Sequence, residues 1–85
     1  MKFKSKFSSS MLKARKAFGY TQSEVAEAVS ISVRWYQKIE SGSKLPGTMT
    51  TLRIILFLHL DIEEFREDIG LSHSLLNVQV KYISR

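Results

Sequence analysis

Apolar residues recur at helical spacing through much of this chain, and short turn signals separate the stretches that carry them. The first such stretch predicts a helix over residues 8–18, in which Met11, Arg15 and Phe18 fall on one side. The serines at its start offer an N-cap, and Gly19 is suited to end it.

Residues 1–7 follow a different pattern, in which lysines alternate with phenylalanine and serine. A period of two is typical of a strand, and a short basic chain end is equally typical of a frayed arm. We expect one of these two structures before the first helix. The lysines concerned are Lys2, Lys4 and Lys6.

A second, short helix is predicted to begin after Thr21. Thr21 and Glu24 have the spacing of a capping box, in which each side chain binds the backbone of the other residue. Its inward face is small and apolar, so that another helix can cross it closely. The inward residues are Val25, Ala26 and Val29.

After a turn at residues 30–32, a third helix is predicted over residues 33–41. Ser32 is suited to cap its start, and Gly42 is suited to end it. Tyr36 and Ile39 face inward at helical spacing, and the remaining arc is polar and cationic. That arc consists of Arg34, Gln37, Lys38 and Ser41.

The second half of the chain predicts three further elements. A fourth helix, capped by Thr48 or Thr50, runs to about residue 58 and is apolar nearly all round, so it needs cover on more than one side. A short fifth helix follows Asp61 over residues 62–68. Residues 76–82 alternate as a strand does. Cover for the fourth helix then comes from this tail or from a second subunit.

These elements make an all-α, five-helix domain with a possible short terminal β-strand, which suits the length of 85 residues. We divide the chain into a basic arm or strand at 1–7, a helical domain at 8–69 and a C-terminal tail at 70–85.

Charge adds a candidate partner. The net charge is +5, but residues 1–60 hold ten lysines and arginines against three glutamates, whereas residues 61–85 hold three against five acidic residues. A basic body favours a polyanion partner, although a merely soluble basic domain explains the same count. No apolar run approaches the roughly 20 residues of a membrane helix, and the basic N-terminus lacks the apolar stretch of a secretory signal, so we expect a cytoplasmic protein.

Candidate catalytic or metal-binding chemistry is sparse. The chain has no cysteine, and His59 and His73 stand without a second ligand at useful spacing. Four carboxylates share the predicted fifth helix, where we interpret them as a solvated face: Glu63, Glu64, Glu67 and Asp68. We therefore expect no enzyme, no metal, no cofactor and no small-molecule ligand.

Several short motifs stand in order over about 55 residues. They are Arg15 with Glu40, Thr21-Gln22, Val25-Ala26, Ile39-Glu40-Ser41-Gly42, Pro46, Leu58 and Ile62-Glu63-Glu64-Phe65. Together they resemble the Cro and lambda-repressor type of helix-turn-helix family, also called XRE-like. The chain departs from that pattern at Ser30 and His59, where the family commonly has glycine, and at Trp35 and Tyr36, which are bulky.

The resemblance implies a helix-turn-helix motif at residues 22–41 whose second helix enters the major groove of DNA. It implies a structural ion pair between Arg15 and Glu40. The implied base contacts are Ser32, Val33, Arg34, Gln37 and Lys38, and the implied phosphate contacts are Gln22, Ser43, Lys44, Thr48 and Thr50.

Two readings of function follow from the resemblance. The first is a sequence-specific transcription regulator, most simply a repressor, that binds a palindromic double-stranded operator as a homodimer. The alternative is an antitoxin-like or mobile-element control protein whose main contact is a protein partner. For the dimer we expect the tail to pair with its twofold mate or with residues 2–7. The expected dimerisation residues are Leu56, Phe57, Leu76, Val78, Val80 and Tyr82.

Overall fold

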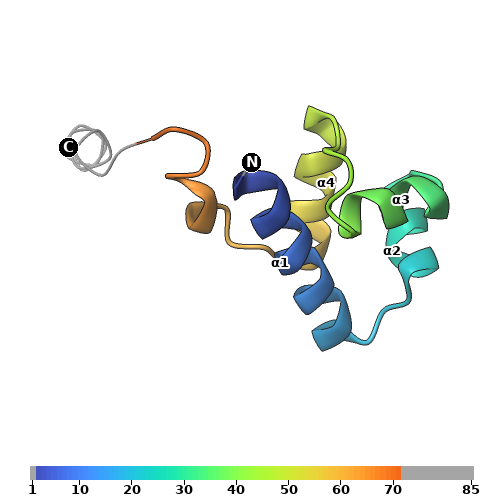
Figure 1. Ribbon diagram of the computed structural model, residues 1–85. Coiled ribbons are helices and arrows are strands. Elements are labelled where there is room, and N and C mark those ends of the chain that lie inside the picture. Colours follow the sequence, from blue (N-terminus) through green and yellow to red (C-terminus); the bar gives the residue numbers. More distant parts are fainter. Residues whose placement is uncertain (1, 72–85) are drawn as a thin grey trace.

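The computed structural model describes residues 2–71 and is all-helical over that range (Figure 1). It contains α1 (Lys2–Phe18), α2 (Gln22–Ala28), α3 (Val33–Glu40), α4 (Thr48–Leu58) and the short 3-10 helix η1 (Ile62–Phe65). The predicted fifth α-helix over 62–68 is thus replaced by one turn of 3-10 helix. The predicted strand at residues 76–82 lies outside the described residues.

The prediction of a basic arm or strand at residues 1–7 is wrong for residues 2–7, which form the first turns of α1. Phe3 and Phe7 are four residues apart, so they share one helix face and their rings stack with centroids 5.2 Å apart. Phe65 of η1 packs edge-on against both rings, at 5.3 and 5.7 Å. The long-range contact with Phe65 therefore favours helix over the local period of two.

The core lies where α1 meets the other elements, and Figure 1 shows α2 and α3 on one side of α1 with η1 on the other. Phe18, which falls on the same side of the helix as Met11 in the sequence pattern, is 49% exposed and lies against Tyr20 and His59. The buried apolar side chains are Phe7, Met11, Val25, Ala26, Val29, Tyr36, Ile39, Ile54, Leu58 and Phe65.

The α2–turn–α3 unit has the predicted local structure. Thr21 and Glu24 form the complete capping box, and the Ser32 side chain accepts a hydrogen bond from the Trp35 backbone N–H at 3.1 Å. Ser30 has φ 64° in the turn, a left-handed conformation that costs a non-glycine residue about 1–2 kcal/mol. Gly42 ends α3 with φ 83°, close to the side chain of Ser8 in α1. The turn before α3 therefore places a serine in a conformation that glycine adopts more readily.

The start of α4 differs from its prediction, because neither Thr48 nor Thr50 caps it. Gly47 is the N-cap residue and makes no side-chain cap bond, whereas the hydroxyl of Thr51 donates to the Gly47 carbonyl at 2.8 Å. At its other end, His59 takes φ 55°, in the position where glycine is common.

The apolar surface of α4 is only partly covered by the described residues. Ile54 and Leu58 are buried, but Leu56 is 74% exposed and Leu52 is 44% exposed. Residues 2–71 therefore leave part of the apolar surface of α4 uncovered, and the tail, one of the two expected sources of cover, lies outside the described residues. None of the described helices is both long and apolar enough to cross a membrane.

Candidate nucleic-acid interface

One face of α3 carries exposed polar and cationic side chains, while the opposite face is buried. Tyr36 and Ile39 are fully buried, and this anchors the helix against α1 and α2. The exposed face follows the i, i+3/i+4, i+7 spacing of a single helical stripe. It consists of Arg34, Gln37, Lys38 and Ser41. This stripe is the surface that α3 offers to a partner.

The N-terminal end of α3 is also open. Val33 is 40% exposed, and Ser32, although its oxygen accepts the cap hydrogen bond, is exposed at the turn. The residues expected to contact bases are therefore all on the surface, at the N-cap and in the first two turns of α3.

A buried ion pair fixes α3 to α1. Arg15 donates through Nε to Glu40 Oε2 at 2.8 Å and through Nη2 to Glu40 Oε1 at 3.0 Å, the parallel geometry that makes such pairs strong. The side chains are only 14% and 5% exposed. Arg15 also donates to the Tyr20 carbonyl at 3.0 Å, which ties in the connection after α1. The ion pair of Arg15 and Glu40 therefore holds α3 at a fixed angle to α1, with the polar and cationic stripe of α3 facing outward.

The Glu40 carboxylate accepts two further hydrogen bonds. The Tyr36 hydroxyl donates to Oε2 at 2.6 Å, and Gln22 Nε2 donates to Oε1 at 2.9 Å. Burial by itself raises the pKa of the Glu40 carboxyl, but the hydrogen bonds from Arg15, Tyr36 and Gln22 outweigh burial and hold that pKa below its ordinary value. The glutamate is therefore ionised at neutral pH.

The same contacts act on the partners of Glu40. The hydrogen bond to Glu40 raises the pKa of the Arg15 guanidinium. Burial, followed by the hydrogen bond to Glu40, raises the pKa of the Tyr36 hydroxyl well above its ordinary value. Tyr36 therefore stays a neutral hydrogen-bond donor, and the cluster carries one positive and one negative charge.

Gln22 and Gln37, expected at separate DNA contacts, lie against each other. Gln37 Nε2 donates to Gln22 Oε1 at 3.1 Å, while Gln22 Nε2 is engaged by Glu40. Sequence reasoning missed this contact because the residues are 15 positions apart and come together only through the crossing of α2 and α3. The capping box also occupies part of the α2 start, since the Glu24 carboxylate accepts from the Thr21 N–H at 2.8 Å. The backbone N–H groups of Thr21 and Glu24 are therefore already bonded within the capping box.

The remaining expected phosphate contacts flank α3 and the start of α4. Ser43, Lys44 and Thr48 are exposed, and Thr50 is half-buried. The hydroxyls of Ser43 and Ser41 lie 2.8 Å apart. The start of α4 leaves backbone N–H groups without a side-chain cap.

Trp35 of α3 and Lys6 of α1 both contact other parts of the fold. Trp35 is half-buried and packs against the core. Lys6 connects α1 to the segment after α4, because its ammonium donates a hydrogen bond to the Glu64 carbonyl and lies 3.2 Å from Asp68 Oδ2. The expected solvated acidic face is thus in part an anchor for α1.

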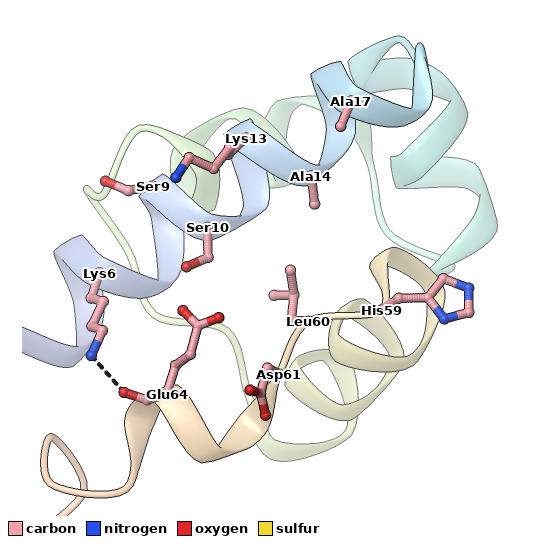
Figure 2. A pocket seen from close by; sticks show the side chains of 10 residues that line it. All are labelled: Lys6, Ser9, Ser10, Lys13, Ala14, Ala17, His59, Leu60, Asp61 and Glu64. Atoms are coloured by element: carbon pink, nitrogen blue, oxygen red, sulfur yellow. Dashed lines mark hydrogen bonds between the residues drawn. The ribbon is translucent and has the colours of Figure 1, made fainter.

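A separate groove of about 410 Å³ lies between α1 and the segment that follows α4 (Figure 2). Lys6 and Glu64 lie at one end of it and His59 at the other, so its ionisable groups do not converge. Among the described residues, no cluster of histidine and acidic side chains is suited to hold a metal ion. The groove therefore gives no catalytic arrangement.

Comparison with known families gives one finding that bears on this surface. A family model described as helix-turn-helix matches residues 11–65, which is more than half of the chain and includes α2, α3 and α4. No curated protein and no solved structure matches the chain.

Proposed function

The chain belongs to the XRE and lambda-repressor type of helix-turn-helix family, and we propose that it is a sequence-specific transcription regulator, most simply a repressor. The family is DNA-binding and regulatory rather than enzymatic. The observation that carries the proposal is the exposed stripe of α3, held outward by the buried pair of Arg15 and Glu40.

In this proposal α3 lies in the major groove. Arg34 binds a guanine through O6 and N7, and Lys38, one turn later, reaches a second guanine or a phosphate. Gln37 reads an adenine, and the exposed Val33 contacts a thymine methyl group. Ser32 contacts the DNA at the start of α3.

Phosphate contacts position α3 without reading sequence. Lys44 and Ser43 follow α3, and the N-terminus of α4 at Thr48 and Thr50 offers uncapped N–H groups, which favour an anion. Gln22 keeps one N–H for a phosphate, because its amide donates only one to Glu40.

We further propose that the protein acts as a homodimer, because one short helix reads few base pairs. The exposed apolar stripe on α4, made of Met49, Leu52 and Leu56, has the spacing of one helix face and supports a self-complementary contact. Phe57 is half-buried and stacks on Tyr20 with ring centroids 5.1 Å apart, so less of its surface than of the Leu56 side chain is open to a second subunit. The tail residues Leu76, Val78, Val80 and Tyr82 lie outside the described residues. Pairing of a tail strand with residues 2–7 is excluded, because those residues are helical.

A second candidate is the antitoxin-like or mobile-element control protein. It is favoured by an open apolar groove of about 440 Å³, lined by residues of α4, η1 and the start of α1, because exposed apolar surface of this kind commonly binds another protein. The oligomeric state of the pure chain separates the two. A stable dimer that binds duplex DNA supports the regulator, and a chain that is soluble only when co-expressed with a partner supports the control protein.

Selection of bound sequences from a random duplex pool tests the proposal. The expected result is a palindromic consensus with half-sites about 34 Å apart, one turn of DNA. If no sequence is enriched at moderate ionic strength, the proposal is contradicted.

Replacement of Arg34 by alanine tests the role of α3 within the selected site. We expect a loss of about 1–3 kcal/mol and a relaxed preference at one base pair. Lys13→Ala is the matched control, since it removes an exposed cation from α1 and leaves base preference unchanged. An Arg34→Ala variant that loses affinity equally for all sequences would make Arg34 a phosphate contact.

A further inference from the structure

A chain of hydrogen bonds runs from the buried Glu40 carboxylate to the exposed surface of α3. Glu40 Oε1 accepts from Gln22 Nε2 at 2.9 Å, and Gln22 Oε1 accepts from Gln37 Nε2 at 3.1 Å. The inner end is buried and the outer end is exposed. The chain therefore connects the ion pair that holds the fold with a side chain of the proposed base-reading stripe.

The Glu40 carboxylate, at the buried end of this series of hydrogen bonds, determines which way the amides of Gln22 and Gln37 are turned. An ionised carboxylate only accepts hydrogen bonds, so Gln22 must turn its Nε2 toward Glu40. The opposite orientation would place two acceptor oxygens together. Gln22 then presents its Oε1 to α3, and Gln37 must meet that oxygen with its own Nε2. The charge of Glu40 thus dictates how the Gln37 amide is turned.

The held amide of Gln37 keeps one acceptor and one donor for a partner. The Gln37 Oε1 takes no part in the hydrogen bond to Gln22, and the Gln37 Nε2 has a second N–H. Adenine offers a matching pair in the major groove, the N6 donor and the N7 acceptor, whereas guanine offers two acceptors there. Holding the amide also lowers the conformational entropy that Gln37 loses on binding.

By contrast, over residues 2–71 neither the Arg34 nor the Lys38 side chain makes a hydrogen bond or ion pair with another residue, so nothing within that range fixes their orientation on the same stripe. We propose that Gln22 is a positioning residue, which transmits the donor and acceptor polarity of Glu40 to Gln37 and so makes Gln37 select adenine. This inference rests on the proposed function, because it concerns how the α3 stripe reads bases.

The test replaces Gln22 with leucine and, in a second variant, with methionine, in the full chain. Both remove the amide but leave Glu40 bound by Arg15 and Tyr36, and thermal unfolding checks that the fold is kept. Affinities are measured for the selected duplex and for duplexes changed at one base pair each. We expect the preference for adenine at one base pair to fall at least about fivefold, the lower limit of a bidentate contact, while the preference that depends on Arg34 is unchanged.

Two comparisons isolate the positioning role. Adding Gln22→Leu to a Gln37→Ala variant should cause no further loss of preference at the same base pair, because the side chain that Gln22 positions is already gone. Ser23→Ala, a change at the neighbouring exposed position of α2, should leave every preference unchanged.

The outcomes separate this inference from the proposed function. If the Gln22 variants lose affinity equally for all duplexes and keep the adenine preference, Gln22 contacts only phosphate and the inference is wrong. If the unmodified chain prefers no sequence, the proposed function fails, and the inference fails with it.

Discussion

At the junction of α1 and α3 the buried Glu40 carboxylate accepts four hydrogen bonds from within the chain, whereas on α4 the Leu56 side chain is 74% exposed. The first region therefore satisfies its polar groups internally, which holds α3 rigidly and leaves its cations free for a partner. The second leaves an apolar stripe and an apolar groove in solvent, and such surfaces commonly mark contacts with another protein.

This difference assigns separate tasks to the two regions. A carboxylate with every acceptor position filled gives a fixed angle to the helix that carries it, as recognition of DNA requires. An uncovered apolar face gives free energy on association instead. We expect changes in the first region to act on stability and base preference, and changes in the second to act on assembly.

The largest expected effect comes from Glu40→Ala, which leaves the Arg15 guanidinium without its partner. Breaking one side of a buried ion pair costs about 3–5 kcal/mol, a large share of the stability of a domain of this size. Chemical denaturation measures the free energy of unfolding. Glu27→Ala is the matched control, because it removes an exposed carboxylate from α2 and should cost less than about 0.5 kcal/mol. Equal losses in the two variants would show that the Glu40 cluster does not hold the fold.

The next effect concerns the apolar side. Leu56→Lys should raise the dissociation constant of the proposed dimer at least about tenfold, which is about 1.4 kcal/mol, because a charged group replaces an apolar contact. Sedimentation equilibrium measures the constant. Ala28→Lys adds the same charge to an exposed position of α2 and should leave it unchanged. A dimer that tolerates Leu56→Lys must use a different surface.

The smallest effect is acid sensitivity of the Glu40 cluster. Because the folded-state pKa of Glu40 lies below its ordinary value of 4.5, the unfolded chain takes up the proton first. The contribution of Glu40 to stability is therefore complete above about pH 4.5 and is lost as the pH falls through the folded-state pKa. Unfolding curves between pH 3 and pH 6 should show a steeper decline for the unmodified chain than for Glu40→Gln. Parallel declines would place the acid-sensitive group elsewhere.

Local signals predicted the centre of the chain well. The capping box of Thr21 and Glu24, the Ser32 cap and the inward positions of Tyr36 and Ile39 are all present, because each depends on residues within about one helical turn. The left-handed conformation of Ser30 also follows from the pattern of the resembling family.

The wrong predictions concern the start of α1 and the cap of α4, and at the start of α1 contacts between residues far apart in sequence decide the local structure. The sequence pattern predicts an arm or strand at Lys6 and Phe7, but Phe65 packs on the Phe7 ring and Asp68 pairs with Lys6, and both partners are far away in sequence. The pattern also predicts a threonine cap for α4, whereas Gly47 occupies that position.

The order of the motifs therefore determined, without coordinates, the helical class, the helix-turn-helix unit and the cationic arc of the third helix, since helix periodicity and capping act over a few residues. Only the tertiary structure decided that α1 begins at residue 2 and that Gln22 joins Glu40 to Gln37. Those features depend on side chains that meet across helix crossings, and no spacing along the chain encodes the distance between them.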